Sequence, residues 1–142
     1  MSDDSQNGAP ERVVAKQATI DLLTKLTELH GGLMIHQSGG CCDGSAPMCY
    51  PVGEYRIGQR DVLVGEIPLP GPLPAVRVWI SGDQFEVWKH TQLVLDVVPG
   101  RGAGFSLEAP EGVRFLSRAR AFSDEENALL EQSPPKTGAD FD

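Results

Sequence analysis

The first regular pattern in the chain is helical and covers residues 11–32. Its apolar positions recur every three or four residues, at Val14, Ala18, Leu22, Leu26 and Leu29. This spacing places them on one face of an amphipathic helix. Pro10 suits the first turn of such a helix, and Gly31 and Gly32 can supply the left-handed residue that ends it. We therefore expect an N-terminal helix that packs one face on the rest of the protein.

After residue 32 the pattern is typical of short β-strands separated by turns. Residues 33–37 are too few for a second helix and predict a strand that enters a glycine turn. Both faces of 91–98 are largely apolar, which predicts a central strand. Ser81-Gly82-Asp83 is expected to form a hairpin connection. The later strands are predicted at 61–67, 75–81, 84–89, 91–98, 104–109 and 113–122.

The two ends of the chain are more acidic than its middle. Residues 1–11 carry a charge of −3 and residues 123–142 a charge of −5, which together make up the net charge of −8. Ser123 and Glu126 predict a capping box for a short final helix. We therefore expect an N-terminal helix packed on a mostly antiparallel β-sheet or sandwich, an α+β fold. The expected parts are a disordered acidic N-terminus over 1–10, a single α+β domain over 11–122, and a short helix with a disordered acidic tail over 123–142.

Length and composition exclude several classes of protein. A chain of 142 residues, 40% hydrophobic and 23% charged, suits one globular core. The chain lacks a run of about 18 apolar residues, so we expect no membrane association. Its polar, acidic start differs from a secretory signal, which predicts a cytoplasmic location. No basic stripe interleaved with aromatic residues occurs, so nucleic acid is not an expected partner.

All three cysteines lie in one glycine-rich segment, residues 36–50. Thiolates with a nearby imidazole favour zinc or another thiophilic metal, and an iron–sulfur cluster is the weaker alternative. The spacing differs from that of zinc fingers and ribbons, and the segment also suits buried, reduced cysteines or a disulfide between Cys41 and Cys42. His36 also suits a hydrogen-bonded core position. The predicted metal ligands are Cys41, Cys42, Cys49 and His36, with His90 as the alternative histidine.

Other residues point to further chemistry less specifically. Arg114, Arg118 and Arg120 share one face of the 113–122 strand, where they can contact an anion, a partner's carboxylates or structural ion-pair partners. No nucleophile elbow surrounds the serines of the cysteine segment, so a serine triad is not expected. Cys41 follows two glycines and has His36 nearby, which makes it the candidate nucleophile of a thiol enzyme.

Three stretches of the chain resemble a known family. Residues 36–49, with Trp88-Lys89-His90-Thr91 and residues 100–108, resemble an uncharacterised bacterial family with a GGCCDGSxPMC signature that is often encoded beside aldehyde dehydrogenases. The resemblance covers about residues 17–122. It implies a link to aldehyde or alcohol oxidation and an aldehyde dehydrogenase as partner.

A weaker resemblance is to the A-type iron–sulfur carriers, the HesB-like proteins. It depends on a helix, a strand, Gly39-Gly40-Cys41 and then residues 104–107, and it implies a similar fold. Those carriers also have a Cys-Gly-Cys near the C-terminus, whereas this chain has no cysteine after Cys49. The expected function is therefore that of a metal-binding accessory protein in aldehyde or alcohol oxidation. The alternatives are a small cysteine-dependent enzyme that acts on an aldehyde-derived compound and a non-catalytic binding module for an aldehyde dehydrogenase.

Overall fold

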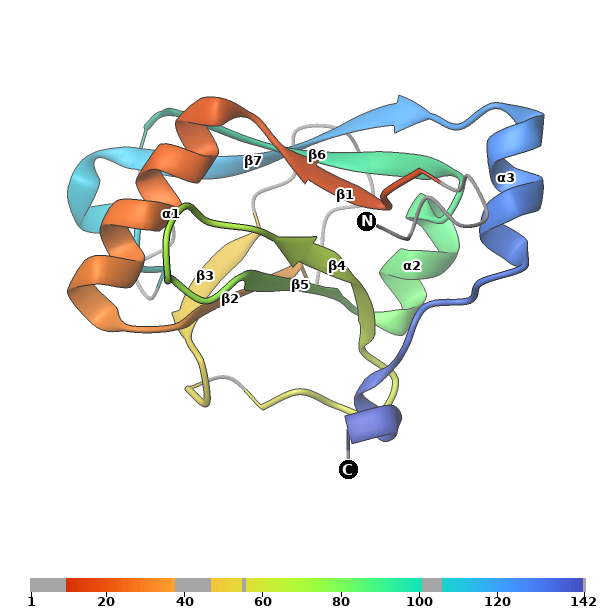
Figure 1. Cartoon of the computed structure of the whole chain (residues 1–142), viewed down its shortest axis with the longest axis horizontal. Coiled ribbons are helices and arrows are strands. Elements are labelled where there is room, and N and C mark those ends of the chain that lie inside the picture. The colour runs from red at the N-terminus through yellow and green to blue at the C-terminus, as the bar shows by residue number, and fades with distance from the viewer. Residues whose placement is uncertain (1–9, 38–46, 55, 101–105, 142) are drawn as a thin grey trace.

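Two β-sheets face each other as separate layers (Figure 1). The structure, a computed structural model, describes residues 10–37, 47–54, 56–100 and 106–141. One sheet has the strand order β1-β6-β7 and the other the order β3-β2-β5-β4. The pairs β1–β6 and β2–β5 are parallel, and the other three pairs are antiparallel. The predicted α+β fold with mostly antiparallel strands is confirmed. The strands are β1 (Val13–Ala15), β2 (Leu33–Gln37), β3 (Met48–Pro51), β4 (Val62–Ile67), β5 (Val76–Ile80), β6 (Thr91–Pro99) and β7 (Val113–Ala121).

Three α-helices accompany the sheets: α1 (Gln17–His30), α2 (Gly82–Trp88) and α3 (Asp124–Glu131). Helix α1 ends at Gly31, whose φ of 86° is the left-handed backbone expected there. The helix begins later than the periodicity predicts, because residues 13–15 pair with β6 as a strand. The amide of Lys16 and the hydroxyl of Thr19 both donate to the carbonyl of Leu95 at 3.0 Å, which fixes the start of α1 on the same strand.

Helix α2 replaces a predicted strand. The predictions of a strand over 84–89 and of a hairpin at Ser81-Gly82-Asp83 are wrong, because Ser81 is an N-cap whose Oγ accepts from the amide of Gln84 at 3.3 Å. The alternation of Phe85 and Val87 suggested a strand, but Val87 is 54% exposed while Trp88 is buried. The apolar face therefore has the three-residue spacing of a helix.

Two of the predictions for the second half of the chain are confirmed, and one is wrong. Strand β6 lies in the centre of its sheet, as predicted. In α3 the capping box is confirmed, since Ser123 Oγ accepts from the amide of Glu126 at 3.1 Å and the Glu126 carboxylate accepts from the amide of Ser123 at 2.9 Å. The predicted strand at 104–109 is absent from its described part, where residues 106–108 form a bend and a turn.

The last described residues pack on β4 and the turn before it. The sequence places this stretch in a disordered tail, but the amide of Leu63 donates to the carbonyl of Lys136 at 2.8 Å. The amide of Gly138 donates to the carbonyl of Asp61 at 2.9 Å, at the start of a short 3₁₀ turn over Gly138–Phe141. A second 3₁₀ turn, Ala109–Glu111, precedes β7.

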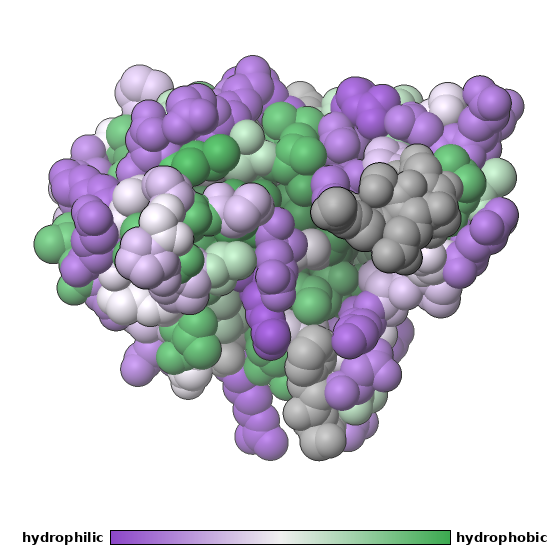
Figure 2. All heavy atoms as spheres, in the orientation of Figure 1, coloured by the Kyte–Doolittle hydropathy of each residue, from purple (hydrophilic) through white to green (hydrophobic). Residues whose placement is uncertain are grey.

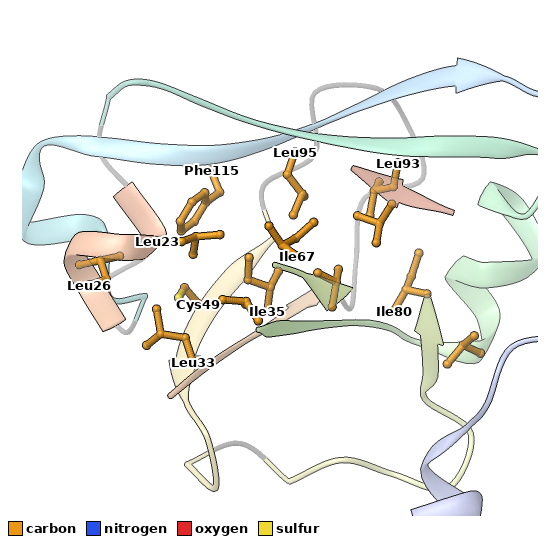
Figure 3. Close-up of a cluster of buried hydrophobic side chains, with 14 of the residues drawn as sticks. Leu23, Leu26, Leu33, Ile35, Cys49, Ile67, Ile80, Leu93, Leu95 and Phe115 are labelled. Carbon is orange, nitrogen blue, oxygen red and sulfur yellow. The ribbon is translucent and has the colours of Figure 1, made fainter. Parts of the chain in front are cut away.

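The hydrophobic core fills the space between the two sheets and is closed at one side by α1 (Figure 3). Leu23 of α1, Ile35 of β2 and Phe115 of β7 are fully buried in it. Ile35 is paired with Cys49, so both side chains face the core. His36, one residue further along β2, points to the opposite face of the sheet because side chains alternate along a strand.

The face of the molecule in view carries an exposed apolar area near its middle (Figure 2). A groove of about 490 Å³ runs there between the start of the chain and the end of β4, with Val14, Ile20 and Pro68 among its lining residues. None of the helices formed by the described residues is long and apolar enough to cross a membrane.

The contact between Gly138 and Gly58 predicts the effect of adding a methyl group. A Cβ on residue 138 falls well inside van der Waals contact with the carbonyl oxygen of Gly58, so Gly138→Ala must push residues 136–141 away from the turn before β4. We expect a loss of about 1–3 kcal/mol in the free energy of unfolding, with faster amide exchange over 136–141. Gly32→Ala is the matched control, because its Cβ meets only ordinary contacts at 3.6 Å or more. Equal exchange rates in the two variants would contradict the packing described here.

Candidate functional site

Near its start, the cysteine segment (residues 36–50) is hydrogen-bonded to both sheets through Gln37. Gln37, the last residue of β2, is 1% exposed, and its side-chain oxygen accepts a hydrogen bond from the hydroxyl of Ser117 in β7. The carbonyl of Gln37 also accepts from the amide of Ser81 at 3.1 Å. Cys41 and Cys42 follow within residues 38–46, which lie outside the described residues. The start of the segment is thus fixed by buried polar contacts on two sides.

The other end of the segment is fixed at Cys49, which is fully buried in β3. Its amide donates to the hydroxyl oxygen of Ser106 at 2.8 Å, and its carbonyl accepts from the amide of Leu107 at 3.1 Å. The Ser106 hydroxyl in turn donates to Oε1 of Glu108, whose Oε2 accepts from the amide of Phe115 at 3.5 Å. We call Cys49, Ser106 and Glu108 the buried triplet. It joins β3, the chain after residue 105 and β7.

The buried triplet contains two acidic groups in an apolar setting. Burial raises the pKa of the Cys49 thiol far above its usual range, and the negative charge of Glu108 raises it further. The thiol is therefore neutral at physiological pH when no cation is bound. Glu108 is 1% exposed, and among the described residues no basic side chain lies within ion-pair distance of it. A buried carboxylate costs several kcal/mol unless a cation or several hydrogen bonds compensate it.

The donor atoms of the triplet suit a metal ion but are too few to hold one alone. A thiolate and a carboxylate are both common zinc ligands. Within the described parts of the chain, no three His, Cys, Asp or Glu side chains gather closely enough to hold a metal. Cys49 and Glu108 would therefore need Cys41, Cys42 or solvent to complete a coordination shell.

His36 lies on the other face of the four-stranded sheet. Its Nε2 is 3.0 Å from Oδ1 of Asp61, and its side chain is 3% exposed. Oδ2 of the same carboxylate accepts from the amide of Gly58 at 2.8 Å. The structure thus brings His36 to Asp61 and does not bring it to Cys49. Sequence reasoning singled out the histidine but missed its partner, because Asp61 follows His36 by 25 positions on a turn without a recognisable motif.

His90 and the arginines of β7 lie in other surroundings. Nδ1 of His90 is 3.2 Å from Oδ1 of Asn127, at the side of the molecule where α2 and α3 lie (Figure 1). Arg118 pairs with Asp96 at 2.9 Å and Arg120 with Glu126 at 3.2 Å, so these two make the structural ion pairs that the sequence left as one alternative. Arg114 lies beside Gly100.

Four buried polar residues of the site were not predicted: Gln37, Ser106, Glu108 and Ser117. A signal for two of them is present, since Ser106 and Glu108 are polar residues two positions apart in a stretch that also contains Phe105 and Leu107. An exposed strand face gives the same pattern, and only the sheet packing shows that both side chains turn inward.

The contact between His36 and Asp61 predicts that the histidine stabilises the fold. His36→Ala leaves a largely buried carboxylate without its imidazole partner, so we expect the free energy of unfolding to fall by about 1–3 kcal/mol. Urea denaturation of His36→Ala, Asp61→Asn and the double variant measures the coupling between the two side chains. Additive effects of the two substitutions would mean that the pair contributes nothing specific.

Comparison with known proteins gives one match. Neither a curated protein nor a solved structure matches the chain. The likeness to A-type iron–sulfur carriers and the link to aldehyde dehydrogenases therefore stay predictions. A family model described as a domain of unknown function, DUF779, matches residues 22–121, a span that includes the cysteine segment and the buried triplet. Because this match covers well over half of the chain, the protein belongs to the DUF779 family.

Proposed function

We propose that the protein binds a thiophilic metal ion, zinc in the first instance, through its cysteine segment and acts as an accessory protein in aldehyde or alcohol oxidation. The observation that supports this is the buried triplet, in which Ser106 joins the backbone amide of Cys49 to the Glu108 carboxylate near the end of the segment. The charge of Glu108 also acts on the buried Cys49 thiol. The link to oxidation comes from the resemblance to a family encoded beside aldehyde dehydrogenases.

Electrostatics favour a cation at this place. A metal ion offsets the cost of burying the Glu108 carboxylate, and its charge reverses the effect of burial on the thiol, because a coordinating thiol is deprotonated outright. Cys41 and Cys42 would supply further thiolates from the same segment. For this reason we add Glu108 to the proposed ligands. We do not include His36, because it contacts Asp61.

Two alternatives use the same residues differently. In a small cysteine-dependent enzyme acting on an aldehyde-derived compound, the nucleophile must be a thiol that ionises easily, which favours Cys41 over the buried Cys49. In a non-catalytic binding module for an aldehyde dehydrogenase, the buried triplet only stiffens the segment that meets the partner. Metal-free protein that co-purifies with a dehydrogenase would favour the module.

The proposed site predicts how strongly the protein retains metal. Protein purified without oxygen should contain zinc or another thiophilic metal by elemental analysis, and Glu108→Gln should hold it at least about tenfold more weakly against a chelator, because one charged ligand is lost. Glu111→Gln is the matched control, because Glu111 lies only three positions after Glu108 and the substitution removes the same charge. The side chain of Glu111 is partly exposed and pairs with Lys25. Metal content that falls equally in both variants, or is absent from the unmodified protein, would contradict the proposed site.

The burial of Cys49 predicts how the thiols react in metal-free protein. Cys49 should resist iodoacetamide at pH 8 in the folded protein and react fully in urea, because burial keeps its thiol protonated. Mass spectrometry of the digested protein identifies which cysteines are labelled. Rapid labelling of Cys49 in the folded protein would show that β3 opens readily and would remove the buried triplet as support for the proposal.

A further inference from the structure

A cavity of about 260 Å³ lies between α2 and α3, on the side of the molecule away from β3 (Figure 1). One part of its lining is apolar and comes from Phe85, Leu130, Pro134 and Pro135. The other part is polar and mostly basic. Among the lining residues Arg12, Lys89 and His90 are basic, whereas Glu131 is the acidic one. The cavity therefore combines an apolar wall with an excess of positive charge.

Arg12 is hydrogen-bonded to the end of α3. Its Nη2 donates to the carbonyls of Leu130 at 3.0 Å and Ser133 at 2.7 Å, at the end of α3. Burial lowers the pKa of this guanidinium, which means that its charge is partly removed from water. Among the described residues no carboxylate lies within ion-pair distance of it. An anion in the cavity would offset this loss of hydration.

Lys89 and His90 extend the positive edge of the cavity. The ammonium of Lys89 contacts Oε1 of Glu86 at 2.8 Å, and Glu86 is not part of the lining. His90 also lines the cavity and contacts Asn127, another lining residue. Both residues follow directly on α2, so the helix that sequence analysis missed is the element that places them.

The size of the cavity limits the ligand. Sites for drug-sized ligands usually measure about 300–1,000 Å³, so about 260 Å³ suits a smaller molecule. A neighbouring recess shares Arg12, Phe85 and Lys89 with the cavity and is otherwise mostly apolar, but it measures only about 10 Å³. The recess is too small for a ligand, so the apolar part of a ligand must lie in the larger cavity, against Phe85 and Leu130.

We propose that this cavity binds a small organic monocarboxylate with a short apolar body, the carboxylate facing Arg12 and Lys89. The basic residues recognise the charge, and the apolar wall selects against anions without a hydrocarbon part. The site is separate from the buried triplet and does not depend on metal binding.

Hexanoate is a suitable probe, with 1-hexanol and acetate as controls that lack the charge and the apolar body respectively. Titration of the 142-residue chain followed by amide NMR should give saturable shifts at Lys89, His90 and Asn127 with hexanoate, and weaker binding of both controls. Lys89→Gln should weaken hexanoate binding about fivefold, as expected for a half-exposed ion pair. Glu86→Gln should tighten it about twofold, because it releases the ammonium of Lys89.

A control variant separates this effect from a general change in charge. Lys25→Gln removes the same charge from α1, where Lys25 pairs with Glu111, and should leave hexanoate binding unchanged. The proposal is overturned if hexanoate shows no saturable shifts at these amides. It is also overturned if 1-hexanol binds as tightly as hexanoate, or if Lys89→Gln and Lys25→Gln affect binding equally.

Discussion

The burial of the Glu108 carboxylate between the two sheets is the constraint on which the candidate site depends. Its two oxygens accept hydrogen bonds from Ser106 and from the amide of Phe115, and Ser106 accepts one from the amide of Cys49. A single acidic side chain thus ties β7 to β3. Replacing buried charged groups by apolar ones is often neutral or stabilising, so packing alone gives no reason for an acid at this position. The cation-binding role proposed above would give one.

The four-stranded sheet separates two kinds of polar chemistry on its two faces. Gln37 and Cys49 face the core, where their partners come from β7 and from the chain after residue 105. His36 faces the other side and contacts Asp61, whose carbonyl also accepts from Gly138. The outer face therefore contacts the turn before β4, which in turn bonds to the end of the chain. The inner face holds the two ends of the cysteine segment by hydrogen bonds.

Helix α2 and the two residues after it line the basic cavity between α2 and α3. As a strand, residues 84–89 would have extended the sheet, but as a helix they place Lys89 and His90 opposite α3 and form one wall of the basic cavity. Arg12 completes this arrangement from the start of the chain, since its guanidinium bonds to carbonyls at the end of α3. Three segments that are distant in the sequence thus form one cavity, and two of them supply its basic residues.

The sequence by itself determined the elements whose signals are local. The helical character of α1, its glycine end, the apolar run of β6 and the capping box of α3 each depend on residues a few positions apart, and each appears in the structure. The predicted apolar face of α1 is wrong in part, because the helix buries Leu23 and Leu26 while Leu29 is 62% exposed. Clustering of the cysteines also identified the segment of interest. The tertiary structure alone decided that 13–15 form a strand, because only pairing with β6 stabilises so short a stretch. It alone decided that Ser106 and Glu108 are buried, and that His36 and Cys49 face opposite sides of a sheet. Such facts depend on which strands become neighbours, and strand pairing is set by contacts between residues far apart in the chain.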